Sequence, residues 1–168
     1  MMERVLSWAL ALTLGVLLLG VAFLQITGPT PNSIFGIVAA RSHIGLFEPY
    51  GRYLTELGEI VAVALVIWPR TRSQGALLAL AIALVAVVIH LSPWLGVQLP
   101  QGPAVSQALA MGKSPAEIAA MNLPTDKGGL FLLSLAIAVL SAGTYFVERA
   151  KMRALSAKKA KKPIGAFA

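Results

Sequence analysis

The sequence predicts an all-α integral membrane protein built on a four-helix bundle. Of its 168 residues, 57% are hydrophobic and only 12% are charged, and the mean hydropathy is +0.77. A soluble domain of this size cannot bury so much apolar surface in a single core. Most of that surface comes from four long apolar segments, Val5–Ile26, Leu54–Trp68, Gly75–Leu91 and Gly128–Val147.

Each of these segments has about the length that a membrane-crossing helix needs. A helix rises about 1.5 Å per residue, so roughly 17–25 apolar residues cross a hydrocarbon layer about 30 Å thick. With their flanking residues, the four predicted spans cover about residues 5–26, 52–68, 74–92 and 128–147. The first is too long for the apolar part of a signal peptide and no small-residue cleavage pattern follows it, so we expect it to remain as a helix.

The connections between the spans differ in length. Pro69–Ser73 is so short that the second and third helices must be antiparallel neighbours. The two other connections, 27–51 and 96–127, are long. Within the first, Ser33–Ala40 predicts a short helix at the membrane interface. Within the second, a capping box that begins at Ser114 predicts a short amphipathic helix over Pro115–Met121.

The basic residues predict the orientation. Ten of the 14 Lys and Arg residues lie at one end of the spans, seven of them in the predicted basic tail 149–168. Because Lys and Arg of short connections stay in the cytoplasm, we expect both termini on the cytoplasmic side of a bacterial inner membrane and both long loops on its outer side. The charge of +7 is then explained by topology and lipid headgroups, without a nucleic-acid partner.

Polar side chains that can take part in binding or catalysis gather at the outer end of the predicted bundle, and we expect the inner half to be almost purely apolar. Arg52, Glu56 and Glu59 are four and three residues apart, so they share one face of the second helix. Antiparallel pairing brings His90 of the third helix to the level of Glu56. An ionisable group at the bilayer centre costs roughly 2.5–3.5 kcal/mol, which makes each of them a functional candidate.

This outer cluster predicts a pocket for a quinone headgroup, a small anion or a metal ion. Glu59 and His90 are the candidate catalytic groups, because either can exchange the proton that accompanies quinone reduction. The candidate substrate-binding groups are Arg41, Arg52, Glu56 and Asp126. Structural roles stay open for all of them: Arg52 and Glu56 form an i,i+4 pair, and Asp126 stands where a helix cap would.

A metal site would use His43, His90 and Glu59, which have suitable donor atoms but no recognisable ligand spacing. The chain has no cysteine, which excludes iron–sulfur clusters and covalent haem held by this chain. The patterns of serine hydrolases and of phosphate-binding loops are also absent.

Several motifs, in order, resemble the DoxX-like family of small bacterial four-helix membrane proteins. They are the carboxylate-bearing stretch Glu48–Glu59, the Pro-Arg-Thr-Arg turn 69–72, the histidine that ends the third helix, His90, and Asp-Lys-Gly-Gly-Leu-Phe at 126–131. The resemblance covers about residues 34–147 and places Glu59, the turn and His90 at recurrent positions of the family. It implies a membrane subunit associated with an oxidoreductase system. The long loop 96–127 departs from the simpler members.

Two functions follow as hypotheses. The first is a membrane subunit of an oxidoreductase system that binds quinone or a small donor at the outer cluster; it holds no redox centre of its own, so electrons come from a partner or a bound cofactor. The second is a non-catalytic accessory or assembly subunit whose small-residue helix faces pack in a larger complex. Both imply the lipid bilayer and other membrane or periplasmic subunits as partners. A transporter is less favoured, because no span is broken by glycine.

Overall fold

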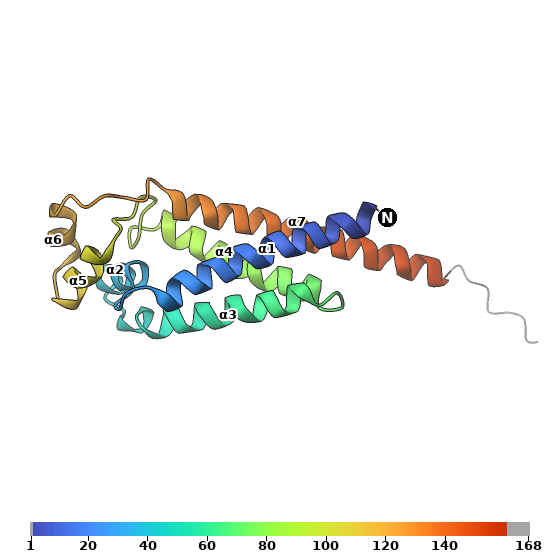
Figure 1. Ribbon diagram of the computed structural model, residues 1–168, viewed down its shortest axis with the longest axis horizontal. Helices are drawn as coiled ribbons and strands as arrows, with labels where there is room; N and C mark the ends of the chain where they lie inside the picture. The colour runs from blue at the N-terminus through green and yellow to red at the C-terminus, as the bar shows by residue number, and fades with distance from the viewer. Residues whose placement is uncertain (1, 161–168) are drawn as a thin grey trace, which may run out of the picture.

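The computed structural model describes residues 2–160, with side chains through residue 157, and within this range every regular element is helical. The predicted all-α class is confirmed. Four long helices run side by side as an elongated bundle (Figure 1). They are α1 (Met2–Thr27), α3 (Tyr50–Ile67), α4 (Arg72–Leu91) and α7 (Gly129–Ala160).

Three of these helices are long and apolar enough to cross a membrane, namely α1, α4 and the part Gly129–Ala157 of α7. This composition indicates a membrane protein. The fourth long helix, α3, has 18 residues and carries Arg52, Glu56 and Glu59. These three side chains are buried inside the bundle, whereas the exposed large residues of α3 are nearly all apolar, among them Leu54, Leu57 and Ile60.

The two long connections fold together at one end of the bundle (Figure 1). They contain α2 (Ser33–Ser42), the 3-10 turn Gly45–Phe47, α5 (Pro103–Ala110) and α6 (Pro115–Ala120). An apolar core of their own holds them together, with Ile37, Val38, Leu95, Leu99, Val105, Ala108 and Ile118 buried in it. We call this assembly the lid and its end of the bundle the lid end. The opposite end, where residues 68–71 join α3 to α4, is the turn end.

Both short helices expected in the connections are confirmed. Helix α2 begins after Asn32, whose side chain accepts hydrogen bonds from the backbone N–H groups of Ile34 and Phe35. Helix α6 begins with the predicted capping box, in which the Ser114 hydroxyl accepts from the Glu117 N–H and the Glu117 carboxylate accepts from the Ser114 N–H. Side-chain caps in the local sequence therefore set the starts of α2 and α6.

The last helix differs from the prediction. It does not end at residue 147 but continues to Ala160, so residues 149–160 of the expected tail extend the helix past the turn end (Figure 1). The stretch is rich in Ala, Lys and Arg, which are good helix formers, and its first helix breaker is Pro163. The rest of the expected tail, from residue 161 onward, lies outside the described residues.

Helices α3 and α4 form the expected antiparallel hairpin, and Gly75 allows their close approach. A Cβ atom at this position would lie 2.6 Å from the Val66 nitrogen, 2.7 Å from the Leu65 Cβ and 2.8 Å from the Ala62 carbonyl oxygen. Two of these three atoms belong to the backbone and cannot rotate away. The contact is possible only without a side chain.

Gly75→Ala is expected to push α3 and α4 apart and to lower the stability of the bundle by about 1–3 kcal/mol, the usual cost of overpacking. Thermal unfolding in detergent, followed by circular dichroism, measures the effect. Gly143→Ala in α7 is the matched control, because its Cβ would meet open space. Equal melting temperatures for the two variants would contradict the close contact at Gly75.

Candidate functional site

A cavity of about 350 Å³ lies within the lid-end half of the bundle. Side chains of α1, α2, α3, α4, α7 and the lid loops line it, and most of them are apolar, such as Leu18, Val38 and Ile137. Leu54 of α3 and Val85 of α4 also line it, and they are 73% and 59% exposed. The cavity therefore reaches the outer surface of the bundle between α3 and α4.

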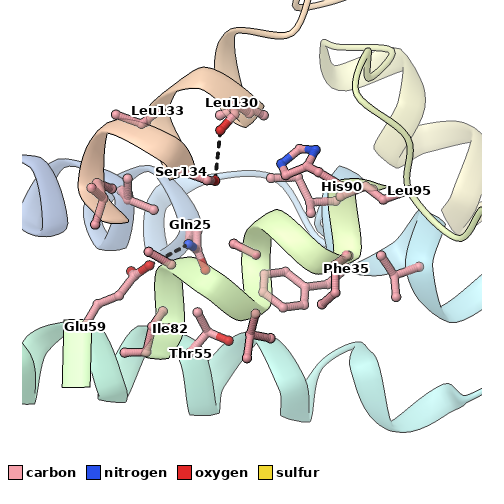
Figure 2. A pocket seen from close by; sticks show the side chains of 18 of the residues that line it. Gln25, Phe35, Thr55, Glu59, Ile82, His90, Leu95, Leu130, Leu133 and Ser134 are labelled. Atoms are coloured by element: carbon pink, nitrogen blue, oxygen red, sulfur yellow. Dashed lines mark hydrogen bonds between the residues drawn. The ribbon is translucent and has the colours of Figure 1, made fainter. Parts of the chain in front are cut away.

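Two of the predicted site residues, Glu59 and His90, line this cavity (Figure 2). The other polar side chains in its wall are Gln25, Thr55 and Ser134. Apolar walls with a few inward polar groups are typical of sites that bind small, largely apolar molecules. This cavity lies between the helices, whereas the sequence predicted a shallow pocket open to the exterior, and of the predicted site residues only Glu59 and His90 line it.

Glu59 is 4% exposed and lies deep in the bundle. Its Oε1 accepts a hydrogen bond of 3.4 Å from the Nε2 of Gln25, which belongs to α1 (Figure 2). The other carboxyl oxygen of Glu59 and the amide oxygen of Gln25 are both buried without a hydrogen-bond partner. This pair presents unused polar atoms in an apolar environment, where a ligand that satisfies them gains most.

His90 occupies a separate part of the cavity wall, apart from Glu59 (Figure 2). Its Nδ1 lies 2.9 Å from the carbonyl oxygen of Gly96, and its ring meets Phe131 edge-on with 5.8 Å between centroids. Because a carbonyl only accepts, Nδ1 carries the hydrogen of this contact, and in a ring with one hydrogen Nε2 is then the acceptor. The lid loop therefore sets the tautomer of His90.

Arg52 and Glu56 share the buried face of α3 with Glu59, as expected, but they do not line the cavity. The Nε of Arg52 lies 3.4 Å from Glu48 and 3.9 Å from Glu56, and its Nη1 donates to the carbonyl oxygen of Gln25 at 3.3 Å. The guanidinium also lies over the ring of Tyr53. Arg52 holds the α1–α3 contact beside the cavity.

Asp126 serves as a cap and does not line the cavity. Its carboxylate accepts hydrogen bonds from the N–H groups of Leu99, Gly128 and Leu130, at 2.8, 3.1 and 3.0 Å. Partial burial acts to raise the pKa of Asp126, but the three N–H donors outweigh it and hold the pKa below its ordinary value. The residue ties the lid to the first turn of α7.

Arg41 and His43 do not join the site. Arg41 is exposed and donates to the carbonyl oxygen of Leu95, which fastens α2 to the lid loop. His43 is exposed and ends α2 in a left-handed conformation, with φ of 58°. Among residues 2–160 no group of three or more His, Asp or Glu side chains is placed to hold a metal ion, so the predicted set His43, His90 and Glu59 is not assembled.

The turn end holds a second buried polar cluster, and the expectation of an almost purely apolar inner half is wrong. Arg72, predicted as part of a cytoplasmic turn, is 1% exposed. Its Nη1 donates to the Ser7 hydroxyl at 2.7 Å and lies 3.5 Å from the Glu148 carboxylate, and its guanidinium lies 4.2 Å from the centre of the Trp8 ring.

Every element around this cluster contributes to its pairing. The Nε and Nη2 of Arg72 donate to the carbonyl oxygens of Val66 and Ile67 at the end of α3. Glu148 of α7 also accepts from the Ser7 hydroxyl and from the Lys151 ammonium, at 3.0 Å for the latter. We call Ser7, Arg72, Glu148 and Lys151 the clasp, because they join the ends of α1, α3, α4 and α7.

Gln25 in the cavity wall and Ser7 and Glu148 in the clasp are not among the residues predicted from the sequence. Gln25 is a polar residue near the end of an otherwise apolar span, and Glu148 is an acidic residue at the start of a basic run. Both irregularities are visible in the sequence. Their partners are distant in sequence, since Ser7 and Glu148 are 141 positions apart, so spacing alone does not pair them.

Searches against protein-family models, curated proteins and solved structures find no significant match to this chain.

Acid is expected to loosen the junction between the lid and α7. Because the folded-state pKa of Asp126 is lowered, the carboxylate stabilises this junction fully at a pH above the ordinary Asp pKa of about 3.9. The stabilisation is lost as the pH falls through the lower pKa of the folded state. Amide hydrogen exchange at Leu99, Gly128 and Leu130, corrected for the intrinsic rate, measures this. Asp126→Ala should lower the free energy of opening at these amides by about 1–2 kcal/mol at neutral pH, the value of a lost cap, and so speed their exchange. It should also remove the acid dependence. An unchanged acid dependence in that variant would refute the assignment.

Arg72→Met is expected to lower the stability of the bundle by about 3–5 kcal/mol, because it leaves the Glu148 carboxylate buried with less compensation. The double variant Arg72→Met, Glu148→Met should recover part of this loss, since no buried carboxylate remains and the Lys151 ammonium, whose side chain is 26% exposed, can reach water. Thermal unfolding in detergent compares the two with Arg70→Gln, a control in the exposed neighbouring position. If Arg72→Met melts like Arg70→Gln, the clasp does not stabilise the fold.

Proposed function

We propose that this protein is a quinone-binding membrane subunit of an oxidoreductase system, with the quinone held in the lid-end cavity. The observation that carries the proposal is the character of this cavity. Its volume of about 350 Å³ falls in the range of small-molecule sites, and its walls are apolar apart from Gln25, Thr55, Glu59, His90 and Ser134. A quinone has the matching composition, with carbonyl oxygens on a ring that carries an apolar tail.

The residues present fit such a ligand. The exposed side chains of Leu54 and Val85 mark where the cavity meets the outside of the bundle, which gives a membrane-soluble molecule a route between α3 and α4. Inside, the second N–H of the Gln25 amide, which is not used by Glu59, can donate to a quinone carbonyl. The unpaired oxygens of Gln25 and Glu59 and the Nε2 of His90 can accept from the hydroxyl groups of the reduced ligand. A bound quinone supplies the capacity to take up electrons together with protons. The residues of this chain orient it and handle the protons.

The proposal includes a topology. We take α3 as the fourth membrane-crossing helix, because its ionisable groups face the bundle and its exposed large residues are nearly all apolar. The distribution of Lys and Arg supports a turn end on the cytoplasmic side of a bacterial inner membrane, together with both termini, and a lid on the outer side. The resemblance to the DoxX-like family favours the same arrangement and the link to an oxidoreductase system.

Equilibrium binding of a short-chain quinone to the purified protein in detergent tests the proposal. The native protein should bind it saturably. Ala86→Phe should abolish binding, because it places a ring in the cavity, and Gln25→Leu should weaken it by roughly 3- to 10-fold, the value of one lost hydrogen bond. Glu117→Gln in the exposed α6 is the control that should bind like the native protein. No saturable binding, or full binding by Ala86→Phe, would rule the proposal out.

A non-catalytic accessory subunit is the second candidate. Gly20 of α1 and Gly143 of α7 favour it, because each would place a Cβ in open space and so leaves a helix surface free for close packing with another chain. Purification of the intact complex in mild detergent separates the two functions. If complexes that contain Ala86→Phe keep their full redox activity, the cavity has no part in the reaction and the accessory role holds.

A further inference from the structure

A row of ionisable side chains connects the lid end with the cavity. Arg52, Glu56 and Glu59 of α3 are spaced by four and three residues, which keeps them on one helical face. Glu48 lies two residues before α3 in an extended conformation, and its carboxylate joins the row through the ion pair with Arg52. The Glu48 side chain is 12% exposed, at the lid, and Glu59 at the other end lines the cavity. We call these four residues the carboxylate row.

The pairing within the row is incomplete. Seven buried side-chain atoms in the described residues have no hydrogen-bond partner, and five of them belong to the row and to Gln25 beside it. They are Glu48 Oε2, Arg52 Nε, Glu56 Oε1, Glu59 Oε2 and Gln25 Oε1. A buried polar atom without a partner costs about 1–3 kcal/mol, so five of them together require a reason.

Fixing the helices does not need this arrangement, as the clasp at the turn end demonstrates. There, Arg72 and Glu148 are equally buried, and none of their side-chain atoms is without a partner. In the carboxylate row, by contrast, the nearest charged atoms of Arg52 and Glu56 are 3.9 Å apart and make no hydrogen bond. Loosely paired buried groups of this kind suit exchange of protons better than rigid support.

The charges of the carboxylate row also favour a role in proton exchange. Arg52 lies within ion-pair distance of Glu48 and Glu56, and in the described residues no Lys or Arg lies within that distance of Glu59. Gln25 of α1 faces Glu59 as a neutral group, and His90 of α4 is the other titratable group in the cavity wall. One guanidinium therefore does not balance the charge of three carboxylates.

We propose that the carboxylate row is a proton path from the aqueous phase at the lid end to Glu59 in the cavity, with Glu56 as its relay. A proton from water binds the Glu56 carboxylate by way of Glu48, and Glu56 then passes it to the Glu59 carboxylate one helical turn further on. Only O–H bonds form and break, no electrons move, and Arg52 stays protonated as the fixed counter-charge. The path rests on the proposed function for its use, which is to deliver protons to a bound quinone.

Infrared spectroscopy of the full chain in lipid nanodiscs, without any quinone, tests the path. The protonated Glu59 carboxyl is identified as the band that disappears in Glu59→Gln, and its hydrogen–deuterium exchange is timed after transfer to deuterated buffer. Glu56→Gln should slow this exchange by about tenfold or more, because the relay is lost and the barrier rises. Glu48→Gln should slow it as well, because the carboxylate at the start of the row is lost. Glu56→Asp should restore rapid exchange, which a merely structural role would not.

Glu3→Gln, which removes an exposed carboxylate at the turn end, is the matched control and should leave the rate unchanged. Native exchange rates in both Glu56→Gln and Glu48→Gln would overturn the path, and so would the absence of any protonated Glu59 band across the stable pH range. Because no quinone is present, these outcomes are independent of quinone binding. If the protein binds quinone but the variants exchange at the native rate, only the proton path is refuted. If exchange is slow in the variants but no quinone binds, the proton path stands and its proposed use is refuted.

Discussion

An ionisable side chain inside an apolar helix bundle must be neutralised by a partner or must line a cavity, because its charge is otherwise very costly there. The two ends of this bundle meet that constraint in opposite ways. At the turn end, the clasp surrounds Arg72 with two backbone carbonyls, a hydroxyl, a carboxylate and an indole ring. At the lid end, Arg52, Glu56, Glu59 and Gln25 retain buried atoms without partners. The first cluster stabilises the fold, and the second is where we place the function.

The lid determines what can reach the second cluster. Its apolar core joins two connections that are far apart in the chain, so it covers the end of the bundle as one body. Polar contacts then attach it to the bundle: Asp126 accepts from the first turn of α7, and the Gly96 carbonyl binds the His90 ring. The Arg41 hydrogen bond to the Leu95 carbonyl joins the two connections within the lid. The cavity consequently adjoins the outside of the bundle between α3 and α4, where a ligand dissolved in the membrane would meet it.

The fold was predictable where the signal is local. Hydropathy and length indicated the four long helices, a five-residue connection required the α3–α4 hairpin, and the Ser114 capping box set the start of α6. The shared face of Arg52, Glu56 and Glu59 followed from helical spacing. The wrong and missing predictions concern tertiary partners. Arg72 has the sequence context of a cytoplasmic turn, and only the position of Ser7, Trp8 and Glu148 on other helices explains why it is buried. For Asp126, the sequence indicated the helix cap as one of two roles, and this role is confirmed, but the bond to Leu99 of the lid has no local signal.

Photo-crosslinking with a quinone that carries a light-activated group tests the central claim most directly, because it reports the position of the ligand. In native membranes, we expect labelled peptides from the cavity walls, around Glu59 in α3, Ile82–His90 in α4 and Leu130–Ile137 in α7, with excess unlabelled quinone preventing the reaction. Labels confined to the clasp region around Arg72 and Glu148, or spread over the outer surface of the helices without competition, would contradict the assignment of function to the lid end.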